Sequence, residues 1–114
     1  MSRVVVVGYC ASGKSSVVTA LQKQGVDAEA VAQEHSVIRE LWNHYRPEKL
    51  IFLDVTLEQI RARRRNPAWP DWIYDLQTER LNGARERADL VVNTAELDLD
   101  SVVQLVLNYL EAND

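Results

Sequence analysis

Cysteine pairs, long apolar runs and net positive charge are all missing from this sequence, and each absence excludes a class of protein. The 114 residues contain one cysteine, Cys10, so an internal disulfide is excluded, and no Cys/His cluster suggests a structural zinc site. No apolar run approaches the roughly 18 residues that span a membrane. The apolar run at residues 4–7 is also too short for a signal peptide. We therefore expect a cytoplasmic protein that does not enter a membrane.

The net charge of −4 disfavours nucleic acid as a partner, because nucleic-acid-binding domains usually carry a basic surface. Positive charge is nevertheless concentrated in one place, at Arg61, Arg63, Arg64 and Arg65. A local basic patch on an acidic protein suits a compact polyanion such as a nucleotide. The alternative is a solvated helix face with ion pairs.

Hydrophobic patterning predicts alternating strands and helices in one domain, residues 1–114. Strands are expected at residues 4–7, 27–32, 50–55 and 90–92. Helices are expected at 14–24, at 36–45 behind a Ser36 cap, from the capping box at 56–59 into the arginine cluster, from Pro70 to about residue 88, and from Asp98 onward. This alternation is typical of an α/β fold, in which helices cover both faces of a parallel sheet.

The segment from Gly8 to Ser15 reads G-x-x-x-x-G-K-S and lies between a predicted strand and a predicted helix, which is the context of a phosphate-binding loop. Its glycines let the backbone curl around a phosphate, and the helix N-terminus adds positive potential. Lys14 is expected to bridge the β- and γ-phosphates, and Ser15 to offer a hydroxyl to Mg²⁺. The sequence therefore predicts a nucleoside triphosphate with Mg²⁺, held by Gly8, Cys10, Ala11, Ser12, Gly13, Lys14, Ser15 and Ser16.

An acidic residue should help to orient the magnesium, and two residues compete for this role. Ligands of parallel sheets lie beyond the carboxyl ends of the strands, where Glu34 follows the second strand and Asp54 ends the third. His35 lies beside Glu34 and is either a proton relay or a helix cap. Asn93 and Thr94 follow the fourth strand.

Two further segments carry a family resemblance. Residues 50–55, followed by Thr56-Leu57-Glu58-Gln59 and the arginine cluster, look like the fourth strand and the start of the lid in nucleoside monophosphate kinases and shikimate kinases, which belong to the P-loop NTPase superfamily. Residues 88–94 and the amphipathic segment after them are similar to the last strand and C-terminal helix of those kinases. With the phosphate loop, the likeness covers about two-thirds of the chain.

This resemblance implies a three-layer P-loop NTPase-like sandwich, with a four-stranded parallel sheet in the order 2-1-3-4. It implies a lid-like segment at about residues 61–75, in which Arg61 and Arg65 act in catalysis and Arg64 binds the nucleotide. It places Asn93, Thr94 and Ala95 beside the base, and it favours Glu34 over Asp54 as the magnesium-orienting acid.

One departure from the family is large. Only about ten residues separate Gln24 from Glu34, where those kinases insert an acceptor-binding region several times longer. The acceptor site is then formed by residues 36–45 and 66–74, or by another subunit, or the acceptor is water. We expect a small kinase that transfers the γ-phosphoryl group of ATP to a small molecule; the alternative is a nucleotide-binding module or slow NTPase.

Three features remain open at the level of the sequence. ATP is favoured over GTP only because no Asn/Thr-Lys-x-Asp element is present. A homodimer is plausible because a four-stranded sheet has two edges. Trp69, Trp72 and Tyr74 either close over a ligand or cover a flank of the sheet, and Cys10 is either a redox-sensitive thiol or a small loop residue.

Overall fold

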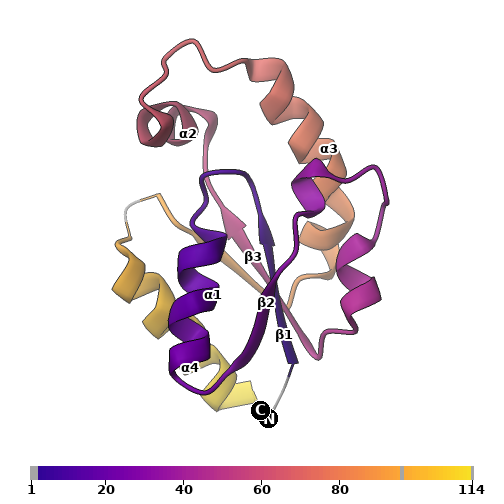
Figure 1. Ribbon diagram of the computed structural model, residues 1–114, viewed down its shortest axis with the longest axis vertical. Coiled ribbons are helices and arrows are strands. Elements are labelled where there is room, and N and C mark those ends of the chain that lie inside the picture. The colour runs from indigo at the N-terminus through magenta and orange to yellow at the C-terminus, as the bar shows by residue number, and fades with distance from the viewer. Residues whose placement is uncertain (1–2, 96, 114) are drawn as a thin grey trace.

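The computed structural model describes residues 3–95 and 97–113 as one open sheet with helices around it (Figure 1). Its strands are β1 (Arg3–Gly8), β2 (Asp27–Ala30), β3 (Lys49–Asp54) and β4 (Leu90–Asn93). Its α-helices are α1 (Lys14–Lys23), α2 (Leu57–Arg64), α3 (Asp71–Arg87) and α4 (Leu99–Asn113). Two short 3-10 helices, η1 (Gln33–His35) and η2 (Leu41–Tyr45), lie between β2 and β3.

All neighbouring strands pair in parallel, and their order is β2-β1-β3-β4, as the sequence predicted. The first strand is central, and each of the four valines at positions 4–7 is fully buried. A continuous β-branched run suits this position because helices cover both faces of a parallel sheet. The strand order brings the carboxyl end of β2 next to that of β1.

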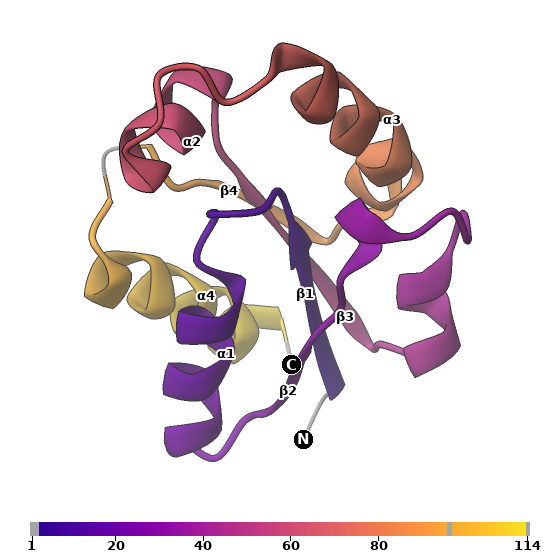
Figure 2. The same cartoon turned by 45° about the horizontal axis from the view of Figure 1, so that its top comes forward.

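Successive residues of β1 point to opposite faces and enter two separate cores. On one face, α1 and α4 pack against Val4 and Val6; on the other, α3, η2 and Ile60 of α2 pack around Val5 and Val7. Figure 2 shows this division, with α1 and α4 on one side of the strands and α3 on the other. The α/β architecture with helices on both faces is therefore confirmed.

The prediction of a helix at residues 36–45 is wrong. Residues 36–40 are irregular, and Val37 and Ile38 are 82% and 48% exposed instead of facing the core. The cause is the buried side chain of Gln33. Its Nε2 donates to the carbonyls of Ile38 and Arg39, at 2.8 and 3.2 Å, and its Oε1 accepts from the amide of Trp42 at 3.1 Å. These bonds hold the backbone in a bent path, and only the short η2 follows.

Local signals at the other helix starts agree with the structure. The capping box at α2 is present, because Thr56 Oγ1 accepts from the Gln59 amide and the Gln59 side chain accepts from the Thr56 amide. Before α4, the carboxylate of Asp98 accepts from the Ser101 amide at 2.8 Å. This bond, together with one from the Ser101 hydroxyl, lowers the pKa of Asp98 below its usual value.

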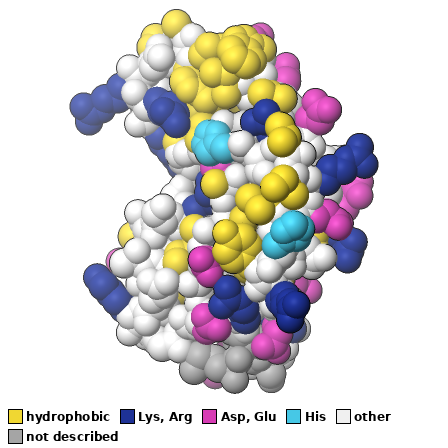
Figure 3. Space-filling view, turned by 45° about the vertical axis from the view of Figure 1, so that its right-hand side comes forward, with side chains coloured by type: hydrophobic (Ala, Val, Ile, Leu, Met, Phe, Trp, Pro, Cys, Tyr) yellow, Lys and Arg dark blue, Asp and Glu magenta, His cyan; other side chains and the backbone are white. Residues whose placement is uncertain are grey.

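Hydrophobic side chains are concentrated at one end of the face shown in Figure 3. In Figure 3 hydrophobic side chains gather where α2 and α3 meet, the end at which Trp72 is 63% exposed. Within residues 3–95 and 97–113, no helix is both long enough and apolar enough to cross a membrane.

The capping box should be measurable in the stability of the protein. Thr56→Ala removes the acceptor for the Gln59 amide, and we expect it to lower the free energy of unfolding by about 1 kcal/mol in urea titrations. Thr56→Ser keeps a hydroxyl oxygen at the same place and is expected to unfold close to the wild-type midpoint. Equal midpoints for the wild type and Thr56→Ala would contradict this account.

Candidate functional site

The phosphate-loop motif lies where strand β1 ends and helix α1 begins. At Gly8 the loop runs so close to β3 that an added Cβ would lie 2.4 Å from the carbonyl oxygen of Leu53. Gly13 has a φ of +92°, in the left-handed region that favours glycine, and the next residue, Lys14, opens α1. Both glycines of the motif are therefore required by the backbone of this fold.

Lys14 points back into the loop. Its Nζ donates to the carbonyl oxygens of Gly8 and Tyr9, both at 3.0 Å, and pairs with the carboxylate of Glu34. Glu34 is only 2% exposed, and its other carboxylate oxygen, Oε1, is buried without a hydrogen-bond partner among residues 3–95 and 97–113. A buried acceptor without a partner is costly, so a donor that reached this oxygen would be bound favourably.

The loop, the start of α1 and the end of β2 line an open cavity of about 460 Å³. Seven residues predicted from the sequence line it together: Cys10, Ala11, Gly13, Lys14, Ser15, Ser16 and Glu34. The small side chains of Ala30 and Ala32 complete the wall. This volume falls within the range of small-ligand pockets.

Helix α1 adds positive potential to this cavity. The amides of Lys14, Ser15 and Ser16 belong to its first turn, so they have no partner within the helix. The Ser15 and Ser16 side chains are exposed. Ser12 differs, because it is 3% exposed and its buried hydroxyl oxygen has no hydrogen-bond partner in the part of the chain that the structure describes. An anion would therefore meet several free N–H donors and one ammonium group.

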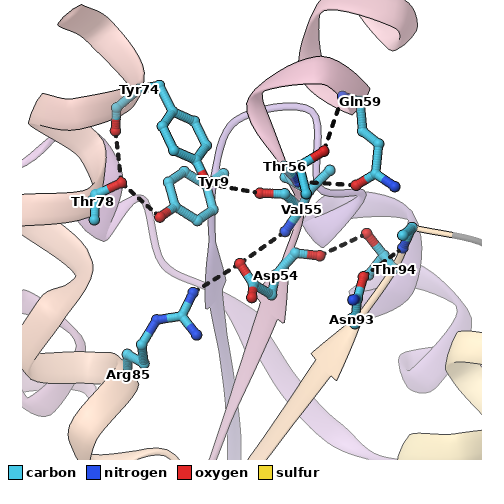
Figure 4. A network of polar contacts seen from close by, with 11 residues as sticks. Tyr9, Asp54, Val55, Thr56, Gln59, Tyr74, Thr78, Arg85, Asn93 and Thr94 are labelled. Atoms are coloured by element: carbon cyan, nitrogen blue, oxygen red, sulfur yellow. Dashed lines mark hydrogen bonds and ion pairs between the residues drawn. The ribbon is translucent and has the colours of Figure 1, made fainter. Parts of the chain in front are cut away.

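Asp54, the other candidate acid, faces a different neighbour (Figure 4). Its Oδ1 lies 2.8 Å from Nη2 of Arg85 on α3 and also accepts from the Val55 amide. Burial opposes the charge of Arg85, but the hydrogen bond and the charge of Asp54 outweigh it and raise the pKa of Arg85. Asp54 does not line the loop cavity, whereas Glu34 does.

Arg63 contacts the phosphate loop. Its guanidinium donates to the carbonyls of Ala11 and Thr94, both at 2.8 Å, and so joins the loop to the segment after β4. Thr94 is buried and also donates to the Asp54 carbonyl, while the Asn93 side chain accepts from the Ala95 amide.

The three arginines named by the resemblance lie in the lid-like segment, away from the loop cavity. Arg61 Nε donates to the carbonyl of Trp69 at 2.9 Å, and the Arg64 guanidinium lies 5.6 Å from the Trp69 ring centre. Arg61 and Arg65 line a shallow hollow with Pro67 on the outer side of α2. Their contact with a nucleotide stays a prediction.

Helix α3 closes the opposite side of the loop. The ring of Tyr9 stacks on Tyr74 with 4.7 Å between centroids, and the Tyr9 hydroxyl lies 2.7 Å from the hydroxyl of Thr78. Burial, with the hydrogen bond and charge of Tyr9, raises the pKa of Tyr74. Trp69 is buried in the α3-side core, and Trp72 is exposed.

Sequence reasoning gave no site role to Arg63, although it named Arg63 in the basic patch, and it did not single out Gln77; both residues carried a usable signal. Arg63 lies three positions after buried Ile60, so helical spacing places it on the same side of α2 as Ile60, although Arg63 itself is exposed. Gln77 lies on the stripe of α3 between Ile73 and Leu81, and a glutamine there is an amide in an apolar position. It is 2% exposed and its side chain bonds to Cys10.

Comparison of the chain with models of known protein families finds no match, and a comparison with curated proteins finds none either. The resemblance to P-loop kinases therefore rests on the loop motif, its strand–loop–helix setting and the strand order.

The close approach at Gly8 predicts a severe effect of a single methyl group. Gly8→Ala forces the new Cβ against the β3 backbone, and we expect it to lower the free energy of unfolding by about 2–3 kcal/mol. Gly83→Ala on α3 is the control, because a Cβ there meets no atom within 4 Å and alanine favours helix. Chemical unfolding of both variants tests this, and similar stabilities would show that β3 does not constrain the loop.

Proposed function

We propose that this chain is a P-loop phosphotransferase that binds ATP with Mg²⁺ at residues 8–16 and transfers the γ-phosphoryl group to a small-molecule acceptor. The observation that supports this best is the Lys14 ammonium group, which lies at the N-terminus of α1 beside a buried carboxylate with one oxygen free. A glycine loop, a helix N-terminus and a lysine together form a phosphate site.

The residues of the loop have distinct roles in this proposal. The amides of Lys14, Ser15 and Ser16 bind phosphate oxygens, since the helix leaves them unpaired. The Lys14 ammonium, which now contacts the carbonyls of Gly8 and Tyr9, exchanges these contacts for the β- and γ-phosphate oxygens. The loop thereby fixes the transferring group in line with the acceptor.

Two residues fit a magnesium ion that accompanies the nucleotide. Ser15 presents an exposed hydroxyl in the first turn of α1, and Glu34 is the acid that lines the same cavity. Bound magnesium neutralises charge that develops on the phosphates during transfer. No three His, Cys, Asp or Glu side chains gather as a metal site in residues 3–95 and 97–113, and magnesium bound with a nucleotide takes most of its ligands from phosphate and water.

The base and the lid-like segment complete the proposed site. Arg63 joins Ala11 to Thr94, so a base beside residues 93–95 would lie against this guanidinium. Arg61, Arg64 and Arg65 would reach the phosphates or the base after the segment at residues 61–75 turns toward the loop. Glu34 rather than Asp54 would orient the magnesium, because Glu34 lines the loop cavity and Asp54 does not.

A nucleotide-binding module or slow NTPase is the second candidate, and the size of the cavity favours it. At about 460 Å³, the cavity beside the loop is sized for one small ligand. A larger hollow of about 970 Å³ lies between residues 36–40 and α3, but no residue of the phosphate loop lines it. The triphosphate alone would then occupy the loop cavity, and water would be the acceptor.

Lysine 14 provides the direct test of binding. Lys14→Ala removes a charged donor, and we expect the Kd for Mg²⁺-ATP in titration calorimetry to rise about 10- to 100-fold. Lys23→Ala, at the exposed far end of α1, is expected to keep the wild-type Kd. Because Lys14→Ala also leaves the Glu34 carboxylate without its cation, each variant is checked for folding by circular dichroism. An unchanged Kd in folded Lys14→Ala would contradict the proposed site.

Acceptor dependence separates the two candidate functions. We expect ADP formation from Mg²⁺-ATP to rise when the correct small molecule is added from a panel of nucleosides, nucleotides and metabolites. Glu34→Gln keeps the shape of the side chain but removes its charge, and it should lower this rate at least tenfold. Slow ADP formation that no acceptor changes, with ATP binding intact, would favour the NTPase.

A further inference from the structure

The contact between α3 and the phosphate loop has a role of its own. We propose that Gln77 is a positioning residue that holds the loop in its phosphate-binding shape through Cys10; its effect on nucleotide binding rests on the proposed function. Gln77 and Cys10 are 2% and 6% exposed. The Gln77 side chain accepts from the Cys10 amide at 3.2 Å and donates to the Cys10 sulfur at 3.3 Å.

A carboxamide matches both groups that Cys10 offers. Its oxygen is an acceptor for the backbone N–H, and its NH₂ is a donor for the sulfur. The hydrogen bond to the backbone N–H matters more, because burying a donor without a partner costs folding free energy. Without Gln77, the loop would have to shift until the Cys10 amide could donate to a water molecule. This explains a glutamine on the stripe between Ile73 and Leu81, where an apolar residue would otherwise be expected.

The same bond sets which donors a phosphate meets. Because the Cys10 amide donates to Gln77, it does not point into the cavity. The donors that a phosphate meets are then the amides at the start of α1. It also orients the preceding residue, Tyr9, whose carbonyl accepts from the Ser12 amide at 3.1 Å and from Lys14 Nζ at 3.0 Å. The loop and Lys14 are thus arranged before any ligand arrives, which lowers the entropy cost of binding.

Tyr9 is held by the same helix, through its stacking on Tyr74 and its hydroxyl contact with Thr78. Two consecutive loop residues therefore rest on α3, and Gln77 is the only one of these α3 contacts that bonds to the loop backbone among the described residues. Because the lid-like segment, at about residues 61–75, runs into the start of α3, the loop and that segment share one support.

The single cysteine of the chain makes the proposal testable without any nucleotide. In Gln77→Met, which keeps the length of the side chain and removes the amide, Cys10 should react with a thiol reagent such as DTNB about tenfold faster than in the wild type. Val106→Ala, in the core between α1 and α4 on the other face of the sheet, is the matched control for lost stability. An unchanged rate in Gln77→Met, or an equal rise in both variants, would overturn the proposal.

A second readout connects the loop to its ligand. Magnesium tripolyphosphate should slow the labelling of Cys10, and the concentration that halves the rate should rise about tenfold in Gln77→Met but not in Val106→Ala. Equal concentrations for all three proteins would overturn the positioning role. If tripolyphosphate protects none of them, the proposed function fails, while the labelling rates still decide the role of Gln77.

If Gln77→Met does not fold, Gln77→Leu replaces it. This variant also has neither an acceptor for the Cys10 amide nor a donor for the sulfur, and leucine favours helix. Labelling faster than the wild type, with Val106→Ala again as control, is the expected result. A wild-type labelling rate would show that Gln77 does not hold the loop.

Discussion

The pairing of the Lys14 ammonium group with the buried carboxylate of Glu34 is the contact on which the geometry of the site depends. A carboxylate that is 2% exposed needs a compensating cation, because burial removes its hydration. The pair joins three segments: the loop after β1, the first residue of α1, and η1 after β2. It is possible only because β2 lies directly beside β1, which brings the carboxyl ends of these two strands together. The electrostatics of the site and the order of the sheet therefore depend on each other.

Helix α3 is the second organising element. Its N-terminal half contacts the loop, and its C-terminal end contacts the end of β3. Gln77 bonds to Cys10 beside the cavity, and Arg85 pairs with Asp54 one strand away. Each of the two acids at the strand ends thus has its own cation, supplied by a different element. Glu34 is paired with a residue of the phosphate loop, whereas Asp54 is paired with the helix that supports the loop. Glu34 therefore lines the cavity in which a ligand would bind, whereas Asp54 connects α3 to the sheet.

Prediction from the sequence succeeded where the signal is local or where burial is complete on both faces. The valines of β1 and the capping box at Thr56 are of this kind, because neighbouring residues alone determine what they do. It failed at residues 36–45, where the apolar positions had helical spacing. Gln33, which lies outside that segment, donates hydrogen bonds to the carbonyls of residues 38 and 39, and Val37 and Ile38 remain exposed. A side chain that acts across several residues cannot be read from periodicity.

The sequence by itself determined the phosphate-loop motif, the alternation of strands and helices, and the lysine and serine placed at a helix N-terminus. These follow from residue types at fixed spacing along one continuous segment. Only the tertiary structure decided which acid meets Lys14, that Arg63 contacts the loop, and that Gln77 fills an apolar stripe to bond Cys10. Each of these is a contact between residues at least 20 positions apart. Such contacts depend on how the elements pack against the sheet, and the spacing of residues along the chain does not predict that packing.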